Sequence, residues 1–309
     1  MKRIVILLIT LCCAAYAAAA QTSAEEYASR YSLLSSKLGP AGVGIETLLN
    51  KWEADFPQDK DMLTAKFLYY YTKAQSSSVQ VLDQAKYLGT DPVISLKDSL
   101  GRDVRYFQVT EFDDEMFRQA VSALDKVIRI SPDALELRMA KVSALTAYEK
   151  ESPDMAAGEL SALIDYNASS HPSWTYEGVA LDSDAFCTLM QEYCYRMFKI
   201  GSPVSLEAFK KLSEKMSGYF PKNTDFINNL GTYYLVHRQD YKTALKYYNK
   251  VLKINSKDYS AIKNCLLAAR KQKDVKLEKK YLPMLIAVTE SENEKAAAQV
   301  RLDAIKNAK

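Results

Sequence analysis

Histidine and cysteine are the side chains here that could bind a metal or act as a nucleophile, and both are scarce. His171 and His237 are the two histidines of the chain, and neither has a Cys or His at the spacing of a metal site. We expect both to be turn or surface residues. No HExxH, GxSxG or P-loop string occurs. The run GPAGVG near residue 40 has the wrong glycine spacing for a phosphate-binding turn, so we expect no metal and no cofactor.

Beyond the first twenty residues, three cysteines remain: Cys187, Cys194 and Cys265. Cys187 and Cys194 lie seven residues apart in a stretch with helical periodicity. Two helical turns, about 10 Å, are too far for one disulfide bond, so buried thiols are expected. A nucleophilic Cys–His pair has no support beyond the presence of both residue types. The sequence therefore predicts that the chain is not an enzyme.

The first twenty residues, MKRIVILLITLCCAAYAAAA, have the layout of a secretory signal peptide. A basic start precedes an apolar run and then small residues, with cleavage expected after Ala20. A membrane anchor is disfavoured because the apolar run is short and no basic stop follows it. Lipid attachment at Cys12 or Cys13 is disfavoured because Leu11 stands where a small residue is expected. We expect an exported chain without a transmembrane segment after cleavage, in the periplasm or else secreted or associated with the outer membrane.

Charge is unevenly distributed along the chain. Residues 242–281 hold twelve basic and three acidic residues, a net charge of +9, whereas residues 21–241 have a net charge of −8. A basic surface including Lys263, Arg270 and Lys271 would attract an acidic protein, an anionic glycan or a lipid headgroup. The alternative is a set of solvated outer helix faces. Nucleic acid is not expected as a partner, because the chain is predicted to be exported and its overall charge is near zero.

Two stretches share one spacing of large and small apolar residues, at steps of three, four, three and one. Both patterns make a single stripe along an α-helix. An alanine in second place leaves room for the backbone of another helix. The two sets are Tyr241, Ala244, Tyr248, Val251 and Leu252, and Phe117, Ala120, Leu124, Val127 and Ile128.

A second helix is predicted just upstream, with Ile227, Leu230 and Tyr234 on one side and the small Gly231 in the middle. The order of residue types closely resembles the tetratricopeptide (TPR) repeat. The first helix has an apolar residue, then Leu-Gly and then Tyr. The second helix has Asp-Tyr, Ala, Tyr and an apolar pair. This unit spans residues 224–258, with one extra residue expected in the turn before Asp240. Residues 259–290 form the next unit, in which Leu266 replaces the small Gly231 and Glu278 replaces the small Ala244. The closing ENEKAAAQVRLDAI is interpreted as a capping helix.

Proline spacing extends the pattern towards the N-terminus, with inserts at about 76–112 and 166–183. Residues 90–110 predict a β-hairpin around Gly101. We expect this hairpin to be the only sizeable strand content of the chain. The fold class expected is all-α: a right-handed TPR-type helical solenoid with a small β-hairpin insert, as a single domain over 21–309. The inserts are similar to those of exported TPR proteins of Bacteroidota, for which no activity is assigned.

Resemblance to TPR proteins implies a non-enzymatic scaffold that holds a protein or peptide partner on the first helices of its repeats. The basic segment would favour an acidic partner. The Lys, Asn and Arg clamp of chaperone-binding TPR proteins is not matched, because the corresponding positions are Asn228, Thr232, Lys263 and Leu267. Trp174 and Tyr176, in an irregular insert, are either exposed anchors or packing residues. The alternative function is a glycan-binding accessory of outer-membrane nutrient uptake. The candidate binding residues are Asn228, Thr232, Lys263, Arg270, Lys271, Trp174 and Tyr176.

Overall fold

A computed structural model describes residues 24–307 of the chain. These residues cluster into two compact units. The first unit comprises residues 24–87, 91–148 and 173–180, and the second comprises 88–90, 149–172 and 181–307. The predicted signal peptide, residues 1–20, lies outside the described residues. The prediction of one continuous solenoid over 21–309 stays a prediction.

Antiparallel helix pairs make up most of the first unit. A helix over residues 24–38 is followed by α2 (Ile45–Asp55), α3 (Lys60–Ala74), α4 (Asp114–Ile130) and α5 (Leu135–Glu149). Asp59 and Asp113 begin α3 and α4 as N-caps, each accepting a hydrogen bond from the backbone N–H three residues on. The stripe that begins at Phe117 faces inward on α4, with four of its five residues buried.

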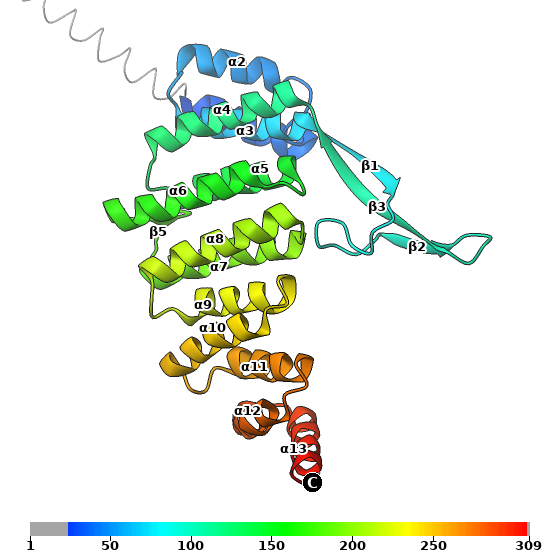
Figure 1. Ribbon diagram of the computed structural model, residues 1–309. Coiled ribbons are helices and arrows are strands. Elements are labelled where there is room, and N and C mark those ends of the chain that lie inside the picture. The colour runs from blue at the N-terminus through cyan, green and yellow to red at the C-terminus, as the bar shows by residue number, and fades with distance from the viewer. Residues whose placement is uncertain (1–23, 308–309) are drawn as a thin grey trace, which may run out of the picture. The chain divides into compact units, whose positions relative to one another are not determined.

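A three-stranded antiparallel sheet separates α3 from α4 in sequence (Figure 1). Its order is β1 (Gln75–Val81), β3 (Asp103–Phe112) and β2 (Ile94–Lys97). The β2–β3 hairpin confirms the predicted hairpin, with Gly101 in the left-handed region at φ 76°. Confining strand content to residues 90–110 was wrong, because β1 was missed. The run QSSSVQV is polar and exposed, and it becomes a strand by pairing with β3.

A second, smaller hairpin joins β4 (Thr175–Tyr176) to β5 (Val179–Ala180). Both residues of its two-residue turn, Glu177 and Gly178, have positive φ, as the twist of such a hairpin requires. The irregular insert predicted over 166–183 therefore contains a short hairpin, and its first residues continue helix α6 as far as Ser170.

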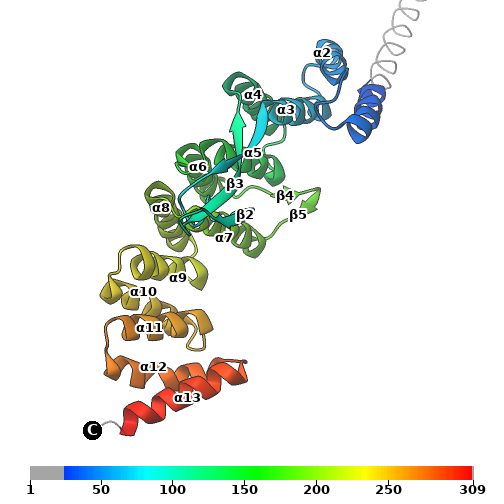
Figure 2. The same cartoon turned by 90° about the vertical axis from the view of Figure 1, so that its right-hand side faces the viewer.

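Helices of the second unit follow one another as a stack of antiparallel pairs (Figures 1 and 2). This is the arrangement of a TPR-type α-solenoid, which confirms the predicted fold class. No helix among residues 24–307 is apolar over a length that would cross a membrane. The elements are α6 (Asp154–Ser170), α7 (Ser183–Ile200), α8 (Pro203–Tyr219), α9 (Thr224–Thr232), η1 (Tyr233–His237), α10 (Tyr241–Ile254), α11 (Tyr259–Lys271), α12 (Val275–Val288) and α13 (Glu292–Asn307).

Small residues of the clearest repeat lie where helices meet. Ala244, Tyr248 and Val251 are fully buried on α10, whereas Lys246 faces solvent. A Cβ on Gly231 would stand 2.7 Å from Cζ and 2.8 Å from Cδ1 of Tyr248. The repeat pattern therefore reflects a packing requirement, since any residue larger than glycine at 231 would meet the aromatic ring.

One extra residue of the 224–258 repeat lies inside its first helix. Residues 233–237 form a π-helical turn between α9 and the loop before α10. A π-turn takes up a single inserted residue without breaking the helix. The expectation that the extra residue falls in the turn before Asp240 was wrong. The turns before Asp240 and Asp274 are alike, with Gln239 and Lys273 both at positive φ.

Helix α13 covers the last repeat, as expected for a capping helix. Its buried face is apolar, with Ala298, Leu302 and Ile305 in the core. Near its N-terminus, the Glu294 carboxylate accepts hydrogen bonds from Tyr259 and Thr289 and pairs with Lys263. These contacts connect α13 with the first helix of the preceding repeat.

Candidate functional site

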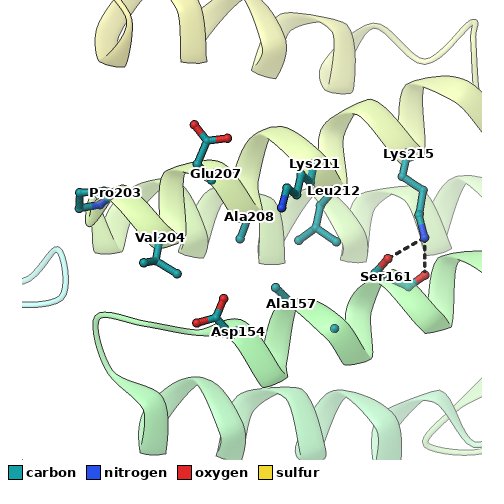
Figure 3. Close-up of a pocket in the computed structure, with 11 residues that line it drawn as sticks. Asp154, Ala157, Ser161, Pro203, Val204, Glu207, Ala208, Lys211, Leu212 and Lys215 are labelled. Carbon is teal, nitrogen blue, oxygen red and sulfur yellow. Dashed lines mark hydrogen bonds between the residues drawn. The ribbon is translucent and has the colours of Figure 1, made fainter.

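A groove of about 670 Å³ runs between α6 and α8 of the second unit (Figure 3). Its floor and walls are mostly apolar, and its volume lies within the range of ligand-binding sites. Polar contacts tie the two helices together towards one end. Lys215 on α8 donates to the Ser161 hydroxyl at 2.6 Å and pairs with Asp165 at 2.7 Å on α6. The apolar lining residues are Ala157, Gly158, Pro203, Val204, Ala208 and Leu212.

Small residues on α6 keep the groove open. Gly158 lies in the middle of the helix, and a Cβ built on it would have no atom within 4 Å. Glycine in a helix costs roughly 0.5–1 kcal/mol relative to alanine, and no packing contact here requires it. The neighbouring Ala157 and Ser161 are also small, so no large side chain of α6 fills the space between these residues and α8.

The groove has charged groups of opposite sign towards its two ends (Figure 3). Asp154 and Glu207 lie near one end, while Lys215 lies at the other with Lys211 before it. Glu207 accepts a hydrogen bond from the Tyr233 hydroxyl, and Lys215 is engaged by α6. Within residues 24–307, Asp154 and Lys211 form no ion pair. These two charges are therefore available to a ligand.

Asn228 and Thr232 are engaged by neighbouring helices of the repeats. The Asn228 amide donates to the Asp258 carboxylate at 3.3 Å, and the Thr232 hydroxyl lies 3.3 Å from the Tyr248 hydroxyl. Both side chains are partly buried. Thr232 thus connects the two helices of one repeat, and Asn228 connects that repeat with the N-cap of α11 in the next.

The predicted basic surface is divided by ion pairs in the structure. Lys263 pairs with Glu294 at 3.0 Å, and Arg270 lies 3.7 Å from the carboxylate of Glu278. Lys271 is exposed next to Arg270. Only part of the excess charge of residues 242–281 is therefore free, and the lysines of α10 form a solvated outer face. Lys263, Arg270 and Lys271 lie at the helix surface as expected, and their role in binding a partner stays a prediction.

Trp174 and Tyr176 have different environments despite their closeness in sequence. Trp174 is 3% exposed, and the Arg138 guanidinium carbon lies 5.6 Å from its ring centre. Trp174 therefore fills a space within the first unit and does not serve as an exposed anchor. Tyr176 is 37% exposed in the β4–β5 hairpin, so it is the aromatic residue of this insert that a ligand could reach.

The three cysteines among residues 24–307 are buried free thiols, as the sequence predicts. Burial raises the pKa of Cys187 to about 11 and that of Cys194 to about 12, which leaves both thiols protonated and weakly nucleophilic at neutral pH. Cys265 is buried in the same way. Among residues 24–307, no group of three or more His, Cys, Asp or Glu side chains could hold a metal ion.

Sequence reasoning missed the groove between α6 and α8. The run of small residues DMAAGELSA at 154–162 was the available signal, because small residues along one helix face mark either a close helix contact or an open groove. Sequence alone does not distinguish the two. The distance between α6 and α8 determines whether these small residues form a close contact or an open groove, and that distance depends on contacts at both ends of the helices.

Comparisons with known proteins give little beyond this description. No protein-family model and no curated protein sequence matches the chain. Among solved structures, pilF of Pseudomonas aeruginosa is similar at 16% identity and a TM-score of 0.40, over 62% of this chain and 77% of that chain. The flexible tandem repeat domain of a bacterial cellulose synthase component is similar at 13% identity and a TM-score of 0.29, over 92% and 98%. The TPR-type fold is evident from the chain's own antiparallel helix pairs.

Proposed function

We propose that the chain is a non-enzymatic scaffold of the cell envelope, which holds a protein partner in the groove between α6 and α8. The observation that carries this proposal is the groove itself: an apolar trough between two helices, with opposite charges towards its ends. Helical repeat proteins use extended surfaces of this kind to bind peptides and proteins. Export to the envelope is supported by the signal-peptide pattern of the sequence.

The groove has the chemistry to take a peptide segment with two or three apolar side chains and an acidic residue. The apolar side chains would cover Val204, Ala208 and Leu212, and the carboxylate would pair with Lys211. An apolar anchor in a pocket with a charge at its edge is a common source of affinity and register in protein interfaces. An acidic partner is also the expectation from the sequence, and the proposed contact is on α8 and not on α11.

Glycan binding has less support as a function. Sugar-binding sites use exposed aromatic rings. Trp174 is buried, and Trp52 is also buried, at 1% exposed in the core of the first unit. Neither tryptophan of the chain is therefore exposed, and Tyr176 is the exposed aromatic residue of the β4–β5 hairpin.

The test is affinity capture from an envelope extract with the wild-type chain and two variants. Gly158→Phe places a ring in the groove, where a Cβ meets open space. Gly218→Phe is the matched control, because Gly218 also lies in a helix with open space around it but does not line the groove. We expect a specific protein to be retained by wild type and Gly218→Phe and lost with Gly158→Phe. Equal retention by all three chains would exclude the groove, and binding on a glycan array without any retained protein would favour the glycan-binding function.

A further inference from the structure

A second, smaller pocket lies where α11, α12 and α13 meet, with a volume of about 230 Å³. Five residues line it, and three of them are basic: Arg270 at the end of α11, Lys273 in the following turn, and Arg301 on α13. The other two are Val275 and Glu278 on α12. Figure 2 shows α11, α12 and α13 as successive layers at the C-terminal end of the second unit.

Glu278 is the structural centre of this pocket. Its side chain is 3% exposed, and both carboxylate oxygens are bound by Arg301, through Nε at 2.9 Å and Nη2 at 2.8 Å. The Nε atom of Arg270 lies 3.7 Å from the same carboxylate. In the preceding repeat, the fully buried Ala244 occupies the equivalent place. The glutamate therefore fixes two guanidinium groups at one point, since a bidentate pair defines both distance and orientation.

The positive charge of the pocket exceeds what Glu278 can neutralise. Three cations face one carboxylate, which leaves a net charge of +2, and Lys273 pairs with no carboxylate within the described part of the chain. The side chains of Arg270 and Arg301 are about half exposed. Each guanidinium has five N–H donors, and the contacts with Glu278 use only some of them. Donors thus remain for a ligand in the pocket.

We propose that this pocket binds a phosphate or sulfate group. Two guanidinium groups held by one buried carboxylate present paired donors to the oxygens of a tetrahedral anion, and Lys273 supplies a third cation. The net charge of +2 favours a dianion over a singly charged carboxylate. A volume of 230 Å³ exceeds the share of several water molecules at about 30 Å³ each, so the group fits with its nearest waters.

This site shares no residue with the groove between α6 and α8, and it does not depend on the proposed scaffold function. Two of the basic residues of 242–281, Arg270 and Lys273, line it. The group could be a free ion or be carried on a larger molecule, and the same recognition serves both. Titration with inorganic phosphate and with glycerol phosphate distinguishes these sources.

The experiment is isothermal titration calorimetry of the full chain in a low-salt buffer without phosphate. Inorganic phosphate is the main probe, sulfate and glycerol phosphate are titrated alongside, and acetate is the singly charged control. Arg270→Gln and Lys273→Gln each remove one pocket cation and leave the Glu278–Arg301 pair in place. Lys271→Gln is the matched control, because it removes the same charge from an exposed neighbour that does not line the pocket.

We expect saturable binding of phosphate and sulfate, with acetate at least tenfold weaker. Arg270→Gln should weaken phosphate binding at least tenfold, Lys273→Gln at least threefold, and Lys271→Gln less than twofold. Tighter binding of glycerol phosphate than of phosphate would indicate an esterified group, and the reverse would indicate a free ion. An equal loss with Lys271→Gln, no saturation, or acetate binding as tight as phosphate would each overturn the proposal.

Discussion

The ring of Tyr248 occupies the space that a side chain on Gly231 would need. A methyl group there would lie 2.7 Å from Cζ of the ring, closer than carbon atoms approach without repulsion. Tyr248 is fully buried, and its hydroxyl lies 3.3 Å from that of Thr232. The ring therefore cannot move aside, and the contact between α9 and α10 depends on glycine at this position.

Replacing Gly231 with alanine should destabilise the chain by about 1–3 kcal/mol, the usual cost of overpacking a core. The same substitution at Gly158 or Gly218 should stabilise it by about 0.5–1 kcal/mol, because helical glycine without a close neighbour only adds entropy to the unfolded chain. Urea denaturation of the three variants measures this. A stabilising Gly231→Ala would mean that α9 and α10 are not in close contact.

Sequence reasoning found that the helix with Gly231 packs against the helix with Ala244, because this contact depends on residue size at a fixed spacing. Large and small residues that recur at helical steps indicate which faces meet, and the structure buries those faces. Strand β1 was missed for the opposite reason: the run QSSSVQV has little apolar character, and its state is decided by the strand it pairs with, which lies about thirty residues away in sequence.

Ala244→Leu should destabilise the chain by about 1–3 kcal/mol, since Ala244 is fully buried in the core of the last repeats. Lys246→Leu, two residues along the same helix but exposed, should change stability by less than about 0.5 kcal/mol. Chemical denaturation of both variants gives the comparison. Similar losses from the two substitutions would mean that the inward face of α10 is assigned incorrectly.

Deleting Val236 should be tolerated. This residue is 54% exposed in the π-helical turn of residues 233–237, and its loss would convert that turn to an ordinary α-helical one. Deleting Lys246 from the middle of α10 should unfold the repeat, because all later residues of the helix would rotate by about 100°. Circular dichroism with thermal melting measures both. Equal damage would show that the extra residue has a structural role beyond its register.

Arg301→Gln should lower the urea midpoint at pH 7 more than Lys306→Gln, a matched change on the exposed face of α13. The hydrogen bonds from Arg301 hold the pKa of Glu278 below its ordinary value of 4.5. A carboxyl whose pKa is lower in the folded than in the unfolded state stabilises the fold above the unfolded value, and this contribution is lost as pH falls through the folded value. The difference between wild type and Arg301→Gln should therefore shrink below pH 4.5.

Denaturation series at pH 7 and at about pH 3.5 test this dependence. A difference that is the same at both pH values would show that Arg301 acts through packing of its side chain and not through the Glu278 carboxylate.

The candidate site could be predicted only in part. The excess of basic residues in the C-terminal segment could be seen from composition. Which of them form ion pairs and which line a pocket depends on partners from α13, and a count of charges does not identify those partners. The sequence shows Glu278 where the preceding repeat has an alanine. The structure explains this glutamate, because Arg301 pairs with its carboxylate. Trp174 was undecided because a loop residue can be buried by a helix distant in sequence, here through Arg138 on α5.

Site-specific photo-cross-linking tests the proposed protein-binding groove most directly. A benzophenone amino acid is placed at position 158 in the groove or, as the control, at position 218 of α8, both glycines with open space around them. The chains are irradiated in envelope extract, and covalent adducts are identified by mass spectrometry. The scaffold proposal predicts one recurrent protein adduct from position 158 and none from position 218. Equal adducts from both positions, or no adduct from position 158, would contradict it.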